Sequence, residues 1–173
     1  MSVVPQEDYL MQRAARGDAT SMERLYALTA TPLFSYLRKL GALHADADDL
    51  LQTTFLNAWR SRQSFRGEGA RPWLFTIARN AWLSHAGRNK AATESNDAGM
   101  ETAENALIAN ELSQALERAL QRLPEDTREA VVLSRVSGLG ISQIAQVLGI
   151  TEGNTRVRIH RGLQQLKKEV EPS

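Results

Sequence analysis

The chain has 173 residues, 42% of them hydrophobic and 24% charged, with a formal net charge of +1, so it has the composition of a globular protein rather than a polycation and any basic surface must be local. It contains no cysteine, which excludes disulfides and cysteine-ligated zinc and fits a reducing cytoplasm. No apolar run approaches the length of a membrane span and no secretion signal is recognisable, so a cytoplasmic protein of one medium or two small domains is expected.

Helical periodicity dominates the N-terminal part, and no segment shows the alternation of apolar and polar residues that is typical of strands. A first short helix fits residues 8–16, and Asp18 can cap a second helix. The dipeptide Thr31-Pro32 has the pattern of an N-cap followed by proline in the first turn. A separate helix is therefore expected to begin there and to end at Gly41.

A further helix is expected over residues 46–62, because Leu51, Phe55 and Trp59 lie four apart and form one apolar stripe. The stretch SFRGEGAR contains two glycines and has no periodicity, which indicates a loop. Pro72 then opens the next helix.

Residues 88–105 are small, polar and partly acidic, and they bury too little apolar surface to offset the cost of ordering. Helical periodicity resumes over residues 106–123, and Pro124 starts another helix with acids in its first turn. The sequence predicts an all-α fold of two small helical domains joined by a flexible linker. Their expected boundaries are residues 1–90, 91–105 for the linker, and 106–173.

The stretch ISQIAQVLGITEGNTRVRIHRGLQQL predicts two helices joined by a tight turn. Ser142 can cap the first helix, Gly149 permits the left-handed turn that ends it, and Thr151 can cap the second. The combination is typical of a helix-turn-helix. The buried side of the second helix is expected to carry Ile159, Leu163 and Leu166.

The second helix of this motif is basic, with five Lys or Arg against one Glu between residues 151 and 168. Arg156 and His160 lie one turn apart on one side, and Arg158 and Arg161 form another row with Asn154. Such a helix fits the major groove of DNA, where arginine reads guanine edges or binds phosphates. The alternative is a solvated helical hairpin whose arginines only keep it soluble.

The segment ALQRLPEDTREAVVLSRVSGLGISQIAQVLGITEGNTRVRIHRGLQQLKK resembles the promoter-reading domain of bacterial RNA polymerase sigma factors. The segment DADDLLQTTFLNAWRSRQSFRGEGARPWLFTIARNAW resembles their polymerase-binding and promoter-melting domain. Both occur in the order of that family, and the small two-domain pattern resembles its extracytoplasmic-function subgroup. The resemblance implies an alternative sigma factor that binds core RNA polymerase and directs promoter-specific initiation.

The resemblance also implies partners. The helix that contains DADDLLQTTFLNAW would dock on a coiled coil of the largest polymerase subunit, and the second domain would contact the flap of the second-largest subunit. The acids at the helix start could instead complement the helix dipole, and both roles can hold. An anti-sigma factor is an expected inhibitor. The motif positions for polymerase binding are Asp48, Asp49, Leu50, Gln52 and Phe55, and the last is expected to be mainly a core residue.

The loop SFRGEGAR and the helix PWLFTIARN match the part of the family that opens the −10 promoter element. Melting requires a trap for an unstacked base, with an aromatic wall and a hydrogen-bonding edge. By resemblance, Phe65 and Asn80 build this pocket, whereas Trp73 is more often structural in such a position. Backbone contacts are expected from Arg66, Arg79, Arg88 and Lys90.

In the second domain, the resemblance makes Arg156, Val157 and His160 base-facing at the −35 element, with phosphate contacts from Asn154, Arg158 and Arg161. The chain departs from the family pattern in the segment with Ser84 and His85 and at Arg71-Pro72.

Catalysis is not expected, because the three histidines are scattered and no metal-ligand spacing, phosphate-binding glycine loop or nucleophile elbow occurs; no cofactor or metal is expected either. A stand-alone helix-turn-helix regulator is the main alternative function, and an adaptor that binds protein without reading DNA is another. The linker could mimic nucleic-acid charge or act only as a spacer. Its acids are Glu94, Asp97, Glu101 and Glu104.

Overall fold

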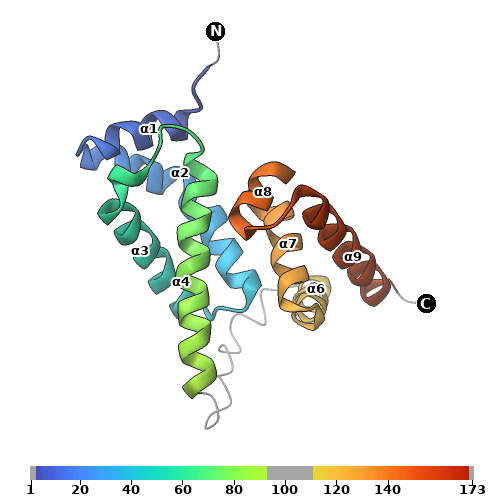
Figure 1. Ribbon diagram of the computed structural model, residues 1–173. Helices are drawn as coiled ribbons and strands as arrows, with labels where there is room; N and C mark the ends of the chain where they lie inside the picture. Colours follow the sequence, from blue (N-terminus) through green and yellow to red (C-terminus); the bar gives the residue numbers. More distant parts are fainter. Residues whose placement is uncertain (1–2, 93–110, 172–173) are drawn as a thin grey trace.

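The computed structural model describes residues 3–92 and 111–171, and these residues form an all-α protein, as predicted (Figure 1). Within those ranges there are eight α-helices, one short 3-10 turn and no strand. The N-terminal half holds α1 (Gln6–Ala15), α2 (Ala19–Leu40), α3 (His44–Arg60), the 3-10 turn η1 (Arg62–Ser64) and α4 (Ala70–Ala92). The C-terminal half holds α6 (Glu111–Arg122), α7 (Glu125–Val136), α8 (Ile141–Leu148) and α9 (Glu152–Val170).

Helix α2 is continuous, and the predicted break at Thr31-Pro32 is wrong because Pro32 lies inside the helix. A proline within a helix removes the hydrogen bond to the carbonyl four residues earlier. Here that residue is Leu28, whose carbonyl therefore loses its usual partner within the helix. Leu25 and Leu33 are fully buried on one stripe of the helix, and this packing outweighs the lost bond.

Other helix ends follow the predicted signals with shifts of a few residues. Asp18 caps α2 by accepting a hydrogen bond from the Ser21 amide at 3.4 Å, and Gly41 ends it with a φ of 120°. Helix α4 continues through Arg88 to Ala92, so the polar segment that starts at residue 88 is at first helical. The rest of the predicted linker, with its four acids, and residues 106–110 of the predicted helix lie outside the described residues.

The helix-turn-helix is formed by α8 and α9. Ser142 lies inside α8 and does not cap it, contrary to the prediction. Gly140 takes the N-cap position instead, because the side chain of Gln143 reaches back and accepts a hydrogen bond from the Gly140 amide at 3.2 Å. The other two signals are confirmed: Gly149 is left-handed with a φ of 68°, and Thr151 Oγ1 accepts from the Asn154 amide at 3.1 Å.

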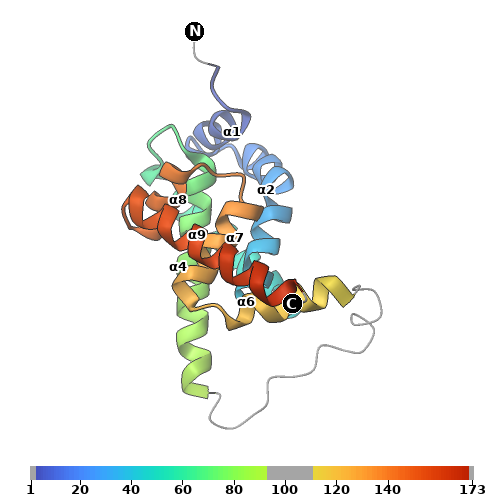
Figure 2. The same cartoon turned by 90° about the vertical axis from the view of Figure 1, so that its right-hand side faces the viewer.

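The two halves pack against each other along one side. Helices α2 and α4 contact α7 and α8, and the buried residues of both halves form a single connected cluster. Tyr36 of α2 and Leu133 of α7, both fully buried, belong to it. Helix α9 lies on the side of the C-terminal half that faces away from the N-terminal half, as Figures 1 and 2 show. The candidate recognition helix is therefore left open to the outside.

The position of α9 depends on a close approach at Gly162. A Cβ atom added there would lie 2.3 Å from Val131 Cγ2 and 2.9 Å from Thr127 Cγ2, both on α7. We expect Gly162→Ala to lower the free energy of unfolding by about 1 kcal/mol or more, because α9 must move away from α7. Thermal unfolding tests this, with Gly153→Ala as the control, since a Cβ at Gly153 meets no atom within 4 Å. Equal losses in both variants would contradict the prediction.

Candidate nucleic-acid interface

Helix α9 presents the predicted −35 residues largely to solvent. Arg156 forms an i,i+4 ion pair with Glu152 at 3.7 Å, and Arg158 is half-buried near Asp126 at 3.9 Å. Val157 is 44% exposed, which leaves an apolar side chain free to contact a thymine methyl group. The remaining members of the predicted set, Asn154, His160 and Arg161, are exposed.

The opposite side of α9 is the one that packs on α7 and α8. Leu166 and Thr155 are buried there, and Ile159 and Leu163 pack against the core, so the predicted apolar side of α9 is confirmed. The buried Thr155 hydroxyl donates a hydrogen bond to the Thr151 carbonyl at 2.8 Å, so it has a hydrogen-bond partner within the first turn of α9. The basic rows are thereby carried on a rigid element whose orientation is set by the core.

The predicted −10 residues gather around the start of α4. Phe65 follows η1, is half-buried, and contacts Trp73 edge-on with ring centroids 5.6 Å apart. Asn80 is exposed on α4 seven residues after Trp73, hence on the same helix face about 10 Å along the axis. An aromatic pair and an amide therefore share one face of the N-terminal half. Trp73 supports the Phe65 ring in this arrangement.

The basic residues of this set differ in their surroundings. Arg66 and Arg88 are exposed, and the side chain of Lys90 lies outside the described residues. Arg79 is half-buried and donates from Nε to Glu129 Oε1 of α7 at 2.5 Å. Arg79 is thus engaged by the other half of the chain.

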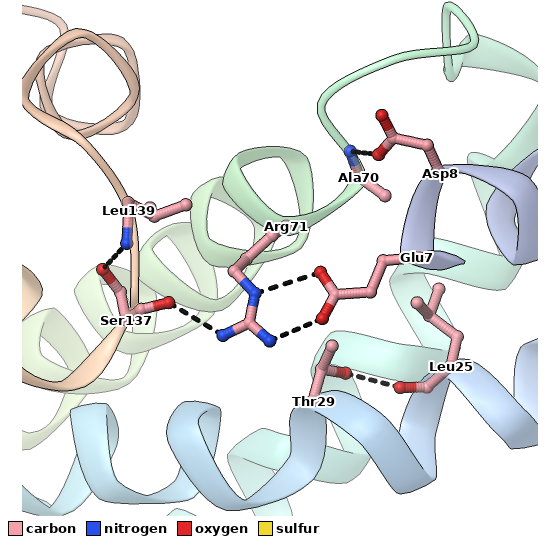
Figure 3. A network of polar contacts seen from close by, with 8 residues as sticks. All are labelled: Glu7, Asp8, Leu25, Thr29, Ala70, Arg71, Ser137 and Leu139. Atoms are coloured by element: carbon pink, nitrogen blue, oxygen red, sulfur yellow. Dashed lines mark hydrogen bonds and ion pairs between the residues drawn. The ribbon is translucent and has the colours of Figure 1, made fainter. Parts of the chain in front are cut away.

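The loop before α4 is held by α1, a contact that the sequence did not predict. The carboxylate of Asp8, only 8% exposed, accepts a hydrogen bond from the Ala70 amide at 2.8 Å (Figure 3). It also accepts one from the Gly69 amide at 3.2 Å. Asp8 thereby caps the first turn of α4 from a distant part of the chain. Gln12 adds a hydrogen bond from Nε2 to the Gly67 carbonyl at 2.6 Å. These bonds fix the glycine-containing loop next to Phe65.

The positions proposed for polymerase binding divide into two groups on α3. Asp48, Asp49 and Gln52 are exposed. Leu50 and Phe55 are buried, and the Phe55 ring meets Tyr26 of α2 edge-on at 4.8 Å. Only the three polar side chains are therefore available to a partner, while the two apolar ones hold α3 against α2.

A polar cluster joins the two halves, and of its members only Arg79 was singled out from the sequence. The buried carboxylate of Glu129 accepts from Arg79 Nε and from the Tyr36 hydroxyl, the latter at 3.0 Å. Burial, and secondly the Glu129 charge, raise the pKa of Tyr36 well above its ordinary value, against a smaller opposing effect of Arg79. Tyr36 and Glu129 are 93 positions apart, so no local pattern signals the contact.

The raised pKa of Tyr36 makes stability depend on alkaline pH. In the unfolded chain tyrosine ionises near pH 10, whereas Tyr36 stays neutral in the fold, so its contribution is complete below that pH and is lost above it. We expect the free energy of unfolding to fall more steeply between about pH 10 and 11 in the wild type than in Tyr36→Phe. Urea titrations at successive pH values measure both slopes, and parallel slopes would contradict the expectation.

Arg71 and His85, two of the residues at which the chain departs from the family pattern, make contacts between elements. Arg71 donates from Nε and Nη2 to the Glu7 carboxylate of α1, at 3.0 and 2.5 Å, and from Nη1 to the Ser137 carbonyl at the end of α7, at 2.8 Å (Figure 3). His85 Nε2 lies 3.6 Å from Asp46 Oδ2. Arg71 therefore links the two halves.

Residues 3–92 and 111–171 contain neither a metal-binding cluster nor a membrane-spanning helix. No group of three or more His, Cys, Asp or Glu residues there is arranged to hold a metal ion. None of the helices in these ranges is both long and apolar enough to cross a membrane.

Two protein-family descriptions match the chain. "Sigma-70 region 2" matches residues 25–92, and "Sigma-70, region 4" matches residues 113–166. The RNA polymerase sigma factor CarQ of Myxococcus xanthus is 37% identical over 164 residues, covering 91% of this chain and 94% of the relative. The ECF RNA polymerase sigma-E factor of Escherichia coli K12 is 29% identical over 188 residues, covering 96% of this chain and 95% of the relative.

Solved structures show the same fold. The sigma factor RpoE of Bartonella quintana, in complex with the anti-sigma factor NepR, is 28% identical with a TM-score of 0.73, covering 86% of this chain and 95% of that one. CnrH, in complex with the cytosolic domain of CnrY, is 24% identical with a TM-score of 0.77, covering 94% of this chain and 96% of that one, which supports the fold alone.

Proposed function

This chain belongs to the extracytoplasmic-function subgroup of bacterial RNA polymerase sigma factors, and we propose how its residues divide the work of that family. As an alternative sigma factor it directs transcription initiation. Residues 1–90 form the part that binds core polymerase and opens the −10 element, and residues 106–173 form the part that binds the −35 element. Residues 91–105 connect them.

The exposed polar face of α3 is the docking surface for core polymerase. Asp48, Asp49 and Gln52 meet basic or polar groups of the largest subunit, and the buried Leu50 and Phe55 keep the helix in place. Charges at the rim of an interface act mainly on the association rate. The face is therefore expected to speed the capture of core enzyme.

Reversing one charge tests this role. We expect Asp49→Lys to slow association with core polymerase by about tenfold at low salt, with a smaller effect as salt rises. Stopped-flow fluorescence measures the rate. Glu23→Lys makes the same charge change at an exposed position of α2 and serves as the control. If both substitutions slow association equally, α3 has no special part in docking.

The face formed by Phe65, Trp73 and Asn80 captures a base of the opened −10 strand. The aromatic pair offers a surface for stacking, and the exposed amide of Asn80 offers donors and an acceptor for a base edge. Arg66, Arg79, Arg88 and Lys90 hold the strand backbone. Unstacking a base costs a few kcal/mol, which stacking and hydrogen bonding on this face offset.

The exposed rows of α9 read the −35 duplex. Arg156, Val157 and His160 face base edges in the major groove. Asn154, Arg158 and Arg161 contact phosphates and set the register of the helix on the DNA. We place the protein in the cytoplasm, where DNA and polymerase are, and assign it no catalytic activity of its own.

Inhibition by a protein partner is a further part of the proposal. RpoE of Bartonella quintana is bound to the anti-sigma factor NepR, and this chain is 28% identical to RpoE in an alignment that covers 86% of this chain. An anti-sigma factor that covers the polymerase-docking or promoter-reading faces would keep the chain inactive.

The observation that carries the proposal is the pairing, on one chain, of an exposed basic recognition helix with an acidic α3 face. The test is co-purification with bacterial core polymerase, followed by transcription in vitro and sequencing of the start sites. A sigma factor binds core and starts transcription at defined promoters. A stand-alone regulator would protect duplex DNA without polymerase, and an adaptor would bind core without promoter-specific starts; either result would overturn the proposal.

A further inference from the structure

The loop that carries Phe65, residues 65–69, has a backbone that does not fix its own shape. Gly67 and Gly69 both lie in the left-handed region, with φ of 94° and 74°. Glycine populates many other conformations as readily, so a loop with two such glycines loses much entropy when it becomes ordered. A base-capturing face built on this loop therefore depends on contacts from elsewhere in the chain.

Helix α1 supplies those contacts from a part of the chain that is distant in sequence. One oxygen of the Asp8 carboxylate accepts from the Ala70 amide at 2.8 Å, as Figure 3 shows. The other oxygen accepts from the Gly69 amide at 3.2 Å. Gln12, one turn further along α1, donates from Nε2 to the Gly67 carbonyl at 2.6 Å. Both glycines of the loop are thus bonded to α1.

These bonds reach further than a helix cap requires. A cap satisfies amides at the start of a helix, which accounts for the bonds to Gly69 and Ala70. The Gly67 carbonyl lies three residues before the start of α4 and has no part in that helix. Both glycines are half-buried, whereas Arg66 and Glu68 are exposed, so the loop lies with its glycines against α1. Helix α1 therefore holds the loop itself and not only the end of α4.

The same bonds lead to the aromatic pair. The Gly69 carbonyl accepts from the Trp73 amide at 3.0 Å, and the Trp73 ring meets the Phe65 ring edge-on with centroids 5.6 Å apart. Gly69, which Asp8 holds through its amide, lies between these two aromatic residues along the chain. A shift of its backbone therefore moves one ring relative to the other.

We propose that Asp8 and Gln12 are positioning residues for base capture, which hold the loop of residues 65–69 in the conformation that lets the Phe65 ring stack on an unstacked base. Both act through the loop and not by contact with DNA. They lie outside the residues that the region 2 description matches, which begin at 25. Because the loop is ordered before the strand arrives, capture does not bear that entropic cost. The inference rests on the proposed function for what the loop captures.

The order of the loop is measurable in the free chain by amide hydrogen exchange followed by NMR. We expect the Gly69 and Ala70 amides to exchange at least about tenfold faster in Asp8→Ala than in the wild type, relative to amides of α3 in the same sample. Asp8→Asn keeps one acceptor oxygen and should fall between the two. Ser21→Ala is the control, because it removes a buried hydroxyl that donates to Asp18 at 2.8 Å and does not touch the loop. It should leave both amides protected.

Promoter opening with core polymerase separates positioning from stability. A chain that is merely less stable loses activity in the same proportion on every template, so the ratio of opening rates at preferred and altered −10 sequences stays constant. A displaced capture face lowers that ratio. We expect Asp8→Ala to lower it by about tenfold, and Gln12→Ala, which loses one bond instead of two, by a few-fold. Ser21→Ala should leave the ratio unchanged.

Each arm has a result that contradicts the inference. If the Gly69 and Ala70 amides are as protected in Asp8→Ala as in the wild type, the carboxylate does not order the loop. If both amides lose protection but the −10 preference stays that of the wild type, loop order does not serve base capture, and the proposed function is untouched. A wild type that opens no promoter with core polymerase would overturn the proposed function and the role in capture together.

Discussion

We expect Arg156→Ala to lower initiation from promoters with the preferred −35 sequence by roughly tenfold to a hundredfold, with core polymerase binding unchanged. An arginine that pairs with a guanine edge through two hydrogen bonds contributes about 1–3 kcal/mol of discrimination. The side chain of Arg156 is 62% exposed, and its ion pair with Glu152 spans 3.7 Å on the helix surface. Such an exposed pair costs little to break on binding DNA.

The control for this substitution lies on the same helix. Arg161→Ala should weaken binding to all −35 sequences about equally and reduce the slope of log affinity against log salt by about one, as expected for a phosphate contact. Both variants are measured by transcription from matched promoters that differ only in the −35 element. If Arg156→Ala also weakens core binding, or loses activity equally at preferred and altered elements, Arg156 does not read bases.

The local features of the fold were predictable because they depend on neighbouring residues. The N-cap at Thr151 and the left-handed turn at Gly149 are set by side chains or backbone freedom within one turn, and both are confirmed. The predictions failed where contacts with other parts of a helix determined where that helix begins or continues. Pro32 stays within α2 because the buried stripe continues past it, and Gly140 displaces Ser142 as the cap because Gln143 reaches back.

The candidate interface divides in the same way. Periodicity alone put the two basic rows of α9 on sides other than its apolar side, so exposure of Arg156 and Arg161 could be predicted. The contact of Arg79 with Glu129 joins residues 50 positions apart and depends on how the halves pack, which no single stretch encodes. The need for glycine at position 162 has the same origin, because the close packing of α9 on α7 leaves no room for a Cβ atom there.

The two proposed DNA-contacting parts differ in how accessible their residues are. In the joined arrangement α9 lies on the outer side, with its basic rows exposed, whereas Arg79 of the −10 part is engaged by α7. A closed chain therefore could not offer its full −10 face. If Arg79 contacts the strand as proposed, it must leave Glu129 before the opened strand is captured.

That order makes Asn80 a test of strand capture alone, since the residue is exposed on α4 and lies outside the polar contacts between the halves described above. We expect Asn80→Ala to slow open-complex formation on duplex promoter DNA by roughly tenfold to a hundredfold, and use of a pre-melted bubble by only a few-fold. On duplex DNA the hydrogen bonds of the amide help to offset unpairing and unstacking. In a pre-melted bubble the bases are already unpaired, so loss of the Asn80 hydrogen bonds has a smaller effect on the rate.

Permanganate footprinting of unpaired thymines measures opening on the duplex, and abortive transcript synthesis measures use of the bubble. Ser84→Ala is the matched control, because Ser84 is exposed one turn further along α4 and also loses a polar group. It should leave both templates nearly unaffected. An equal loss for Asn80→Ala on duplex and bubble would mean that Asn80 supports a step after melting, and base capture would then have to be assigned to other residues on the Phe65 side of α4.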